Sequence, residues 1–249
     1  MKFNREFANQ IIDDLINCVN AASKEIMQIY NSDNFEMSDK ADGSPLTLAD
    51  KASNQIITEG LKKITPDIAV ISEETFEDTI LKALPNLYWL VDPLDGTREF
   101  INKNDEFTVN IALIEDRKPV FGIVAAPVFE KCWHGSIFDN YHSDKSIPDV
   151  LRIVMSKSHK SDNDKSFLNH LNEKGVNYKI IEKGSSLKLC AIADNEADIY
   201  PRFGPTSEWD IAAAHSVLSA YGGCVLKVDD FSDLSYAKKE SILNRYFIC

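Results

Sequence analysis

The sequence predicts an α+β fold, with helices and sheets in layers instead of one purely parallel sheet. Phe3 to Tyr30 carries apolar residues at helical spacing, which predicts one long amphipathic helix. Two apolar runs, 107–114 and 120–126, flank the polar turn 115–119 and predict a β-hairpin. Strand-like and helical segments alternate in the C-terminal half. A chain of 249 residues suits one large domain or two small ones that share an interface.

The N-terminal half is expected to form two helices followed by strands. The polar segment 31–44 predicts a loop after the first helix. Thr47 with Asp50 then resembles a capping pattern that opens a second helix, which runs to about Lys63 and stops before Pro66. The strands expected here are residues 68–71, 88–91, 107–114, 120–126 and 133–138.

The polar segment 139–149 predicts a boundary, which divides the chain into subdomains 1–145 and 146–249. The Ala-rich stretch from Asp210 to Tyr221 predicts a helix that ends at Gly222-Gly223. We expect residues 225–228 to close the sheet. The other elements expected in this half are strands at 151–155, 180–181 and 199–200 and helices at 164–174 and 186–193.

Composition narrows the function. A net charge of −12 argues against a nucleic-acid polymer as partner, whereas a small phosphorylated ligand remains compatible if a divalent metal supplies positive charge. The five cysteines form no CxxC pair, the N-terminus lacks an apolar leader, and no stretch resembles a membrane span. We therefore expect reduced thiols, a cytoplasmic location and no transmembrane segment. A peripheral association with the inner membrane face and the oligomeric state are left open.

The most informative motif is Asp92-Pro-Leu-Asp95-Gly-Thr97, which follows the apolar run 88–91. Two carboxylates this close repel each other unless a cation lies between them, and oxygen ligands suit Mg²⁺. Pro93 and Gly96 could turn the Leu94 carbonyl toward the same ion. Taken alone, the two acids fit a solvated turn equally well.

Acids elsewhere in the chain strengthen the metal interpretation. Glu73-Glu74 follow the strand 68–71 in the same way, and parallel strand ends converge at one edge of a sheet. Asp210 opens the Ala-rich helix, where the simpler reading is a helix-capping acid. A shared site of Asp92, Asp95 and Asp210 with Glu73 is the sharper hypothesis, and Glu74 is read as a solvated neighbour.

Over nearly its whole length the chain resembles the lithium-sensitive inositol monophosphatase superfamily. Within that superfamily it resembles the 3′(2′),5′-bisphosphate nucleotidases. The matching stretches, in order, are Ser44-Pro-Leu-Thr-Leu-Ala-Asp50, Ile71-Ser-Glu-Glu74, Asp92-Pro-Leu-Asp-Gly-Thr-Arg-Glu-Phe-Ile101, Glu106-Phe-Thr-Val-Asn-Ile-Ala-Leu-Ile114, Gly184-Ser-Ser-Leu-Lys188 and Tyr200-Pro-Arg-Phe-Gly-Pro-Thr206, followed by Trp209-Asp210.

The resemblance implies a layered α/β/α/β/α sugar-phosphatase-like fold with two closely packed subdomains. It implies two Mg²⁺ ions, with a third left open. One ion would be held by Glu73, Asp92 and the Leu94 carbonyl, and the second by Asp92, Asp95 and Asp210. The attacking water would lie near the catalytic residues Glu73 and Thr97, with Asp50 orienting the Thr97 hydroxyl.

The implied substrate is adenosine 3′,5′-bisphosphate, with 3′-phosphoadenylyl sulfate as a second, which points to sulfur metabolism. Around the phosphate the expected contacts are Glu73, Leu94, Asp95, Gly96, Thr97 and Asp210, and for the nucleotide they are Ser185, Ser186, Lys188 and Arg202. For Lys188 and Arg202 ordinary surface charge is the competing interpretation. The alternative functions are an inositol or fructose bisphosphate phosphatase and, more remotely, a non-catalytic phosphometabolite sensor.

Overall fold

The computed structural model describes residues 2–32, 38–39, 45–141, 148–157 and 161–249, and its centre is a five-stranded sheet in the order β3-β4-β5-β6-β7. Strands β3 and β4 are parallel, and the other neighbours are antiparallel, so the sheet is mixed. The predicted hairpin is confirmed as the pair β5–β6. The bounds are β3 Ala69–Ser72, β4 Leu87–Asp95, β5 Thr108–Glu115, β6 Lys118–Ala126 and β7 Lys131–Ser136.

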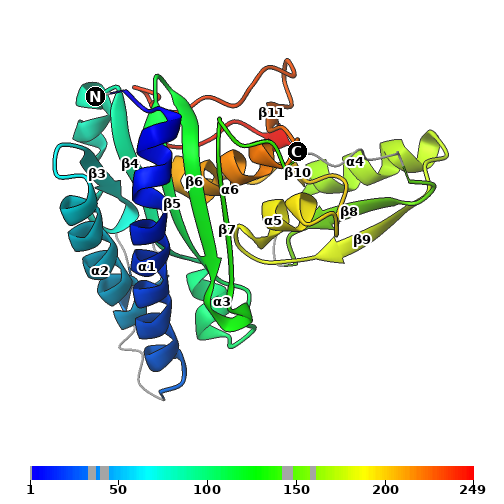
Figure 1. The fold of residues 1–249 in the computed structure, drawn as a ribbon. Coiled ribbons are helices and arrows are strands. Elements are labelled where there is room, and N and C mark those ends of the chain that lie inside the picture. The colour runs from blue at the N-terminus through cyan, green and yellow to red at the C-terminus, as the bar shows by residue number, and fades with distance from the viewer. Residues whose placement is uncertain (1, 33–37, 40–44, 142–147, 158–160) are drawn as a thin grey trace.

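Helices cover both faces of this sheet (Figure 1). The long N-terminal helix α1 (Arg5–Tyr30) and α2 (Leu48–Ile64) lie side by side on one face, and α6 (Glu208–Ala220) crosses the other. Gly122 makes the close approach of α6 possible, because a Cβ there would lie 2.2 Å from the Ala213 carbonyl oxygen. Ser216 Oγ also donates to the Gly135 carbonyl at 3.1 Å. These contacts set α6 directly against β6 and β7.

The sheet's two faces belong to different apolar cores because side chains alternate along each strand. On β4, Trp89 and Val91 pack beneath α1 and α2, whereas Tyr88 and Leu90 pack toward α6. The core on the α6 side also contains Val154, from the C-terminal half of the chain. The predicted division at residue 145 stays a prediction, because it falls within 142–147, outside the described residues.

The C-terminal half adds smaller sheets around α6. Strands β8 (Leu151–Met155) and β9 (Tyr178–Glu182) are parallel and connected through α4 (Asp162–Glu173). A separate three-stranded sheet has the order β10-β12-β11, with β10 Pro201–Arg202, β11 Leu226–Lys227 and β12 Phe247–Ile248. The expectation that residues 225–228 close the main sheet is therefore wrong. The reason is that β11 pairs with β12, whose other neighbour is β10, so these strands form a sheet of their own.

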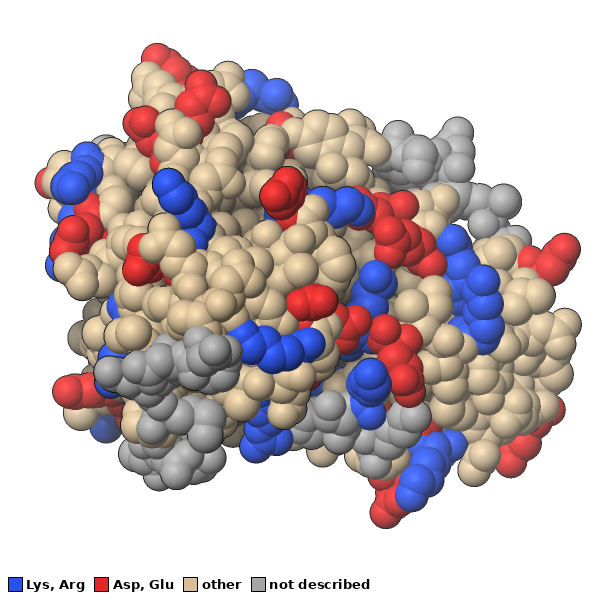
Figure 2. Space-filling view, turned by 90° about the horizontal axis from the view of Figure 1, so that it is seen from below, with Lys and Arg blue, Asp and Glu red and all other residues tan. Residues whose placement is uncertain are grey.

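The remaining elements are short. They are β1 Ser38–Asp39 paired with β2 Pro45–Leu46, α3 Thr97–Ile101, α5 Leu187–Ala193, and the 3₁₀ turns η1 Glu73–Thr75, η2 Asp78–Ala83 and η3 Pro127–Phe129. Among the described residues no helix is both long and apolar enough to cross a bilayer. Figure 2 shows Asp and Glu interspersed with Lys and Arg on the face seen from below, with no broad basic patch there.

Candidate active site

The paired strands β3 and β4 bring the first acids together. Ser72 is the register partner of Val91, so Glu73, the first residue of η1, and Asp92 of β4 follow at the same level of the sheet, as the sequence predicted. Strand β4 continues past Val91 to Asp95, with a register irregularity between Asp92 and Asp95. The extra residue in β4 acts as a bulge, which lets two acids three positions apart point to one side.

Asp210 arrives from the opposite layer, in the first turn of α6. Its carboxylate accepts a hydrogen bond from the Ser207 N–H at 2.9 Å, so the helix-capping interpretation is correct. Its own carbonyl accepts from Ser186 Oγ at 2.7 Å. The ring of Trp209 meets Phe76, just beyond η1, at a centroid distance of 5.1 Å. The start of α6 is thus packed against the turn that carries Glu73.

The acids form one electrostatic group. Burial raises the pKa of Asp92 well above its usual range, and the charges of Glu73 and Asp95 raise it further. Burial likewise raises the pKa of Asp210, with Asp95 and Glu73 as the next causes. The pKa of Asp95 is raised to about 6 by burial, although Lys188 opposes the rise. A cation among these carboxylates would relieve this repulsion.

A second polar pair lies beside them. Thr97 Oγ1 donates to Asp50 Oδ1 at 3.1 Å, and Asp50 is only 1 % exposed. The other carboxylate oxygen of Asp50 accepts from the Thr47 N–H at 2.7 Å and the Thr47 hydroxyl at 2.6 Å, which fixes its orientation. The capping pattern predicted from the sequence therefore orients the Asp50 carboxylate toward the Thr97 hydroxyl.

A pocket of about 120 Å³, open to solvent, adjoins the acids. Asp95, Gly96, Ser185, Lys188, Arg202 and Asp210 line it. Lys188 is only 7 % exposed, and burial lowers its pKa to about 8. Its ammonium donates to the Ser185 carbonyl at 2.7 Å, so Lys188 is no ordinary surface charge. Ser185 Oγ and Arg202 Nε are buried and have no hydrogen-bond partner within the part of the chain that the structure describes.

Two site residues differ from the sequence expectation. Asn110 was not foreseen, yet its amide reaches Asp95 at 3.4 Å and Ser186 Oγ at 3.1 Å. Ser186 is buried, and its hydroxyl donates inward to the Asp210 carbonyl instead of lining the pocket. The signal for Asn110 was its place in the apolar run 107–114, where a polar residue must find partners inside the protein.

The donor set fits a hard divalent cation, since the converging groups are carboxylates, and burial together with neighbouring negative charge raises the pKa values of Asp92 and Asp210. As the side chains lie, however, no three His, Cys, Asp or Glu side chains of the described residues are grouped to hold one ion. Glu73 instead shares a hydrogen bond with Asp92, and Asp210 turns to Ser207. The assignment of individual metal ligands therefore stays a prediction.

Comparison with known proteins identifies a metal-dependent family, in agreement with the carboxylates gathered at the site. Residues 9–246 match the model of the inositol monophosphatase family. The chain belongs to the inositol monophosphatase family. This family is metal-dependent, typically with Mg²⁺.

Individual family members are similar over nearly the full length. The chain is 41% identical to the 3′(2′),5′-bisphosphate nucleotidase CysQ of Salmonella typhimurium over 237 residues, covering 91% of this chain and 94% of that one. It is 38% identical to the protein of the same name from Escherichia coli K12, covering 95% and 98%. A crystal structure of CysQ from Bacteroides thetaiotaomicron superimposes with a TM-score of 0.82 at 33% identity, covering 94% of each chain. The predicted layered α+β fold is thereby confirmed.

Proposed function

We propose that this protein is a Mg²⁺-dependent phosphoric monoester hydrolase that converts adenosine 3′,5′-bisphosphate to AMP and phosphate. We propose 3′-phosphoadenylyl sulfate as a second substrate. One observation carries the proposal. Acids from β4, η1 and α6 converge next to the Asp50–Thr97 pair and a pocket that contains Lys188. The similarity to bisphosphate nucleotidases supports the choice of a nucleotide over inositol.

In this proposal the carboxylates hold two Mg²⁺ ions. Glu73, Asp92 and the Leu94 carbonyl would hold one of them, and Asp92, Asp95 and Asp210 would hold the other. Bound Mg²⁺ supplies charge neutralisation of the phosphate and a lower pKa for a bound water. No covalent intermediate on the protein is needed, so water attacks the phosphorus directly.

The chain's own groups position the reactants. The Thr97 hydroxyl donates a hydrogen bond to Asp50. The lone pairs of the Thr97 hydroxyl oxygen are therefore available to accept a hydrogen bond from the attacking water. Because Asp50 is locked by Thr47, this orientation is established before the substrate binds. Gly96 adopts a φ of 94°, a conformation that side-chain-bearing residues rarely reach. The N–H groups of Gly96 and Thr97 are proposed to hold the phosphate.

The nucleotide end would be recognised by the pocket. Lys188 and Arg202 supply positive charge for the 5′-phosphate, and the unpartnered Arg202 Nε and Ser185 Oγ offer further hydrogen bonds. A neutral inositol ring would offer no negative charge to Lys188 and Arg202.

A substrate panel tests the proposal. Purified protein with Mg²⁺ should release phosphate from adenosine 3′,5′-bisphosphate faster than from inositol 1-phosphate or fructose 1,6-bisphosphate, and a chelator should stop it. Faster turnover of inositol 1-phosphate would replace the nucleotide by inositol as the substrate. Binding without any turnover would favour a sensor over an enzyme.

A further inference from the structure

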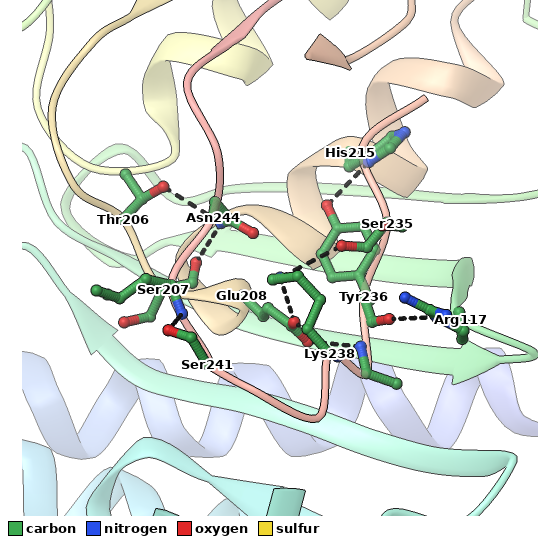
Figure 3. Close-up of polar contacts among 12 residues, drawn as sticks. Arg117, Thr206, Ser207, Glu208, His215, Ser235, Tyr236, Lys238, Ser241 and Asn244 are labelled. Atoms are coloured by element: carbon green, nitrogen blue, oxygen red, sulfur yellow. Dashed lines mark hydrogen bonds and ion pairs between the residues drawn. The ribbon is translucent and has the colours of Figure 1, made fainter. Parts of the chain in front are cut away.

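Glu208 is a completely buried acid that the proposed mechanism does not use. It lies two residues before Asp210 and has an exposure of 0 %. Its carboxylate accepts the N–H of Ala237 at 2.8 Å and that of Lys238 at 3.3 Å. The Lys238 ammonium completes the set as an ion pair, with its side chain 18 % exposed (Figure 3).

These donors belong to the segment 235–244, which we call the strap. The strap holds the start of α6 from a second side as well (Figure 3). The Glu208 N–H donates to the Ile242 carbonyl at 3.0 Å. Asn244 Nδ2 donates to the Ser207 carbonyl at 2.7 Å, and Ser207 in turn donates its N–H to Asp210. The residues just before Asp210 are therefore enclosed by the strap.

The strap also has anchors that do not involve Glu208. Tyr236 Oη and His215 Nδ1, which lies two turns beyond Glu208 on α6, are 2.9 Å apart. The Tyr236 N–H donates to the Arg117 carbonyl at 3.1 Å, and Arg117 Nε donates back to the Tyr236 carbonyl at 3.2 Å. Loss of the Glu208–Lys238 pair would thus leave the strap attached and change only how tightly the first turn of α6 is held.

A buried ion pair contributes little net stability to a fold, because desolvation of the two charges offsets most of their attraction. In this protein the ion pair instead fixes the orientation of the Glu208 carboxylate. Three donors from two adjacent residues fix the Glu208 carboxylate, and these contacts oppose rotation of the first turn about the helix axis. Since Asp210 is on that same turn, its side chain starts from a fixed position.

We propose that Glu208 and Lys238 are positioning residues, whose buried ion pair orients the first turn of α6 so that Asp210 can hold Mg²⁺. This inference rests on the proposed function, in which Asp210 is a metal ligand. Partners that orient metal ligands are worth about 10- to 100-fold in metal affinity, so loss of the pair should weaken metal binding without unfolding the protein.

The test measures Mn²⁺ binding in the absence of substrate, by the electron paramagnetic resonance signal of the free ion. Mn²⁺ serves as the probe because it prefers the same carboxylate ligands as Mg²⁺. Glu208→Gln and Lys238→Met should each raise the dissociation constant about tenfold. Lys238→Arg, which keeps the charge, should remain near wild type.

Asp198→Asn is the matched control. It breaks the ion pair of Asp198 with Arg152, which has an N–O distance of 2.6 Å and joins β8 to the segment after α5. This variant should lose thermal stability but keep wild-type Mn²⁺ affinity. Equal weakening of Mn²⁺ binding in the control and in Glu208→Gln would overturn the proposal, because any loss of an ion pair would then have the same effect.

Asp210→Asn separates failure of this inference from failure of the proposed function. Weak binding in Asp210→Asn with wild-type affinity in Glu208→Gln overturns the positioning role and leaves the proposed site standing. Wild-type affinity in Asp210→Asn overturns both. If Glu208→Gln does not fold, Lys238→Met decides, and wild-type affinity in that variant refutes the role of the pair.

Discussion

In the absence of metal, the free energy of unfolding of the protein should increase as the pH falls from 7.5 to 5.5. The folded state raises the pKa of Asp95 from 3.8 to about 6, so in this range the folded protein binds protons that the unfolded chain does not. Stability therefore rises as the pH decreases toward 3.8 and is lost as the pH rises through about 6. Burial and neighbouring acids shift the pKa values of Asp92 and Asp210 in the same direction.

The size of the effect follows from the pKa of Asp95. Protonation of one group with a folded-state pKa of about 6 adds about 0.8 kcal/mol between pH 7.5 and 5.5. For a chain of this length that corresponds to a rise in Tm of about 2–3 °C, and the other two acids add to it. Lys188 contributes little here, because its pKa of about 8 affects stability mainly at higher pH.

Thermal unfolding in EDTA and in excess Mg²⁺, at both pH values, measures this difference. We expect Tm to rise on acidification in EDTA. Excess Mg²⁺ should remove or reverse that rise, because the bound ion keeps the acids charged. Asp95→Asn should show a smaller rise in EDTA. A Tm in EDTA that stays flat or falls toward pH 5.5 would refute the claim that burial and neighbouring charge raise the pKa values of these acids.

Four further outcomes are expected. Asp92→Asn should abolish Mg²⁺-dependent phosphate release, since it removes the charge at the centre of the group; a near-wild-type rate would rule out a bridging role. Thr97→Ala should lower kcat more than it raises KM, with Thr97→Ser close to wild type, and a change in KM alone would contradict water positioning. Gly122→Ala should lower Tm by about 4 °C or more, since overpacking costs about 1–3 kcal/mol and the new Cβ would meet the Ala213 carbonyl; an unchanged Tm would mean that α6 can move away freely. Li⁺ should inhibit by replacing Mg²⁺, and full activity at high Li⁺ would speak against the family mechanism.

Local sequence patterns predicted most of the helices and strands, because each of these elements is determined by residues close together in the chain. The hairpin of β5 and β6, the capping box of α2 and the helix ending at Gly222 each depend on a few adjacent residues, and all three are present. The arrangement of the chain end was not predictable in this way. Strands β10, β11 and β12 have two residues each, and they pair across long stretches of sequence, with α6 between β10 and β11 and about twenty residues between β11 and β12.

For the site, too, the features that depend on adjacent residues were predicted and those that depend on distant residues were not. The convergence of Glu73 with Asp92 followed from two apolar runs that each end in an acid, and the parallel register of β3 and β4 confirms it. The inward hydrogen bonds of Asn110 and Ser186 could not be read from sequence, because their partners lie on other elements. Glu208 was missed for the same reason, since its donors come from the strap.

The central claim is that acids from separate layers of the fold surround divalent cations. Crystals soaked in Mn²⁺ and measured at the manganese absorption edge test it directly. The account predicts anomalous peaks among the carboxylates of Glu73, Asp92, Asp95 and Asp210. Diffraction data of good quality with no manganese peak at these side chains would contradict it.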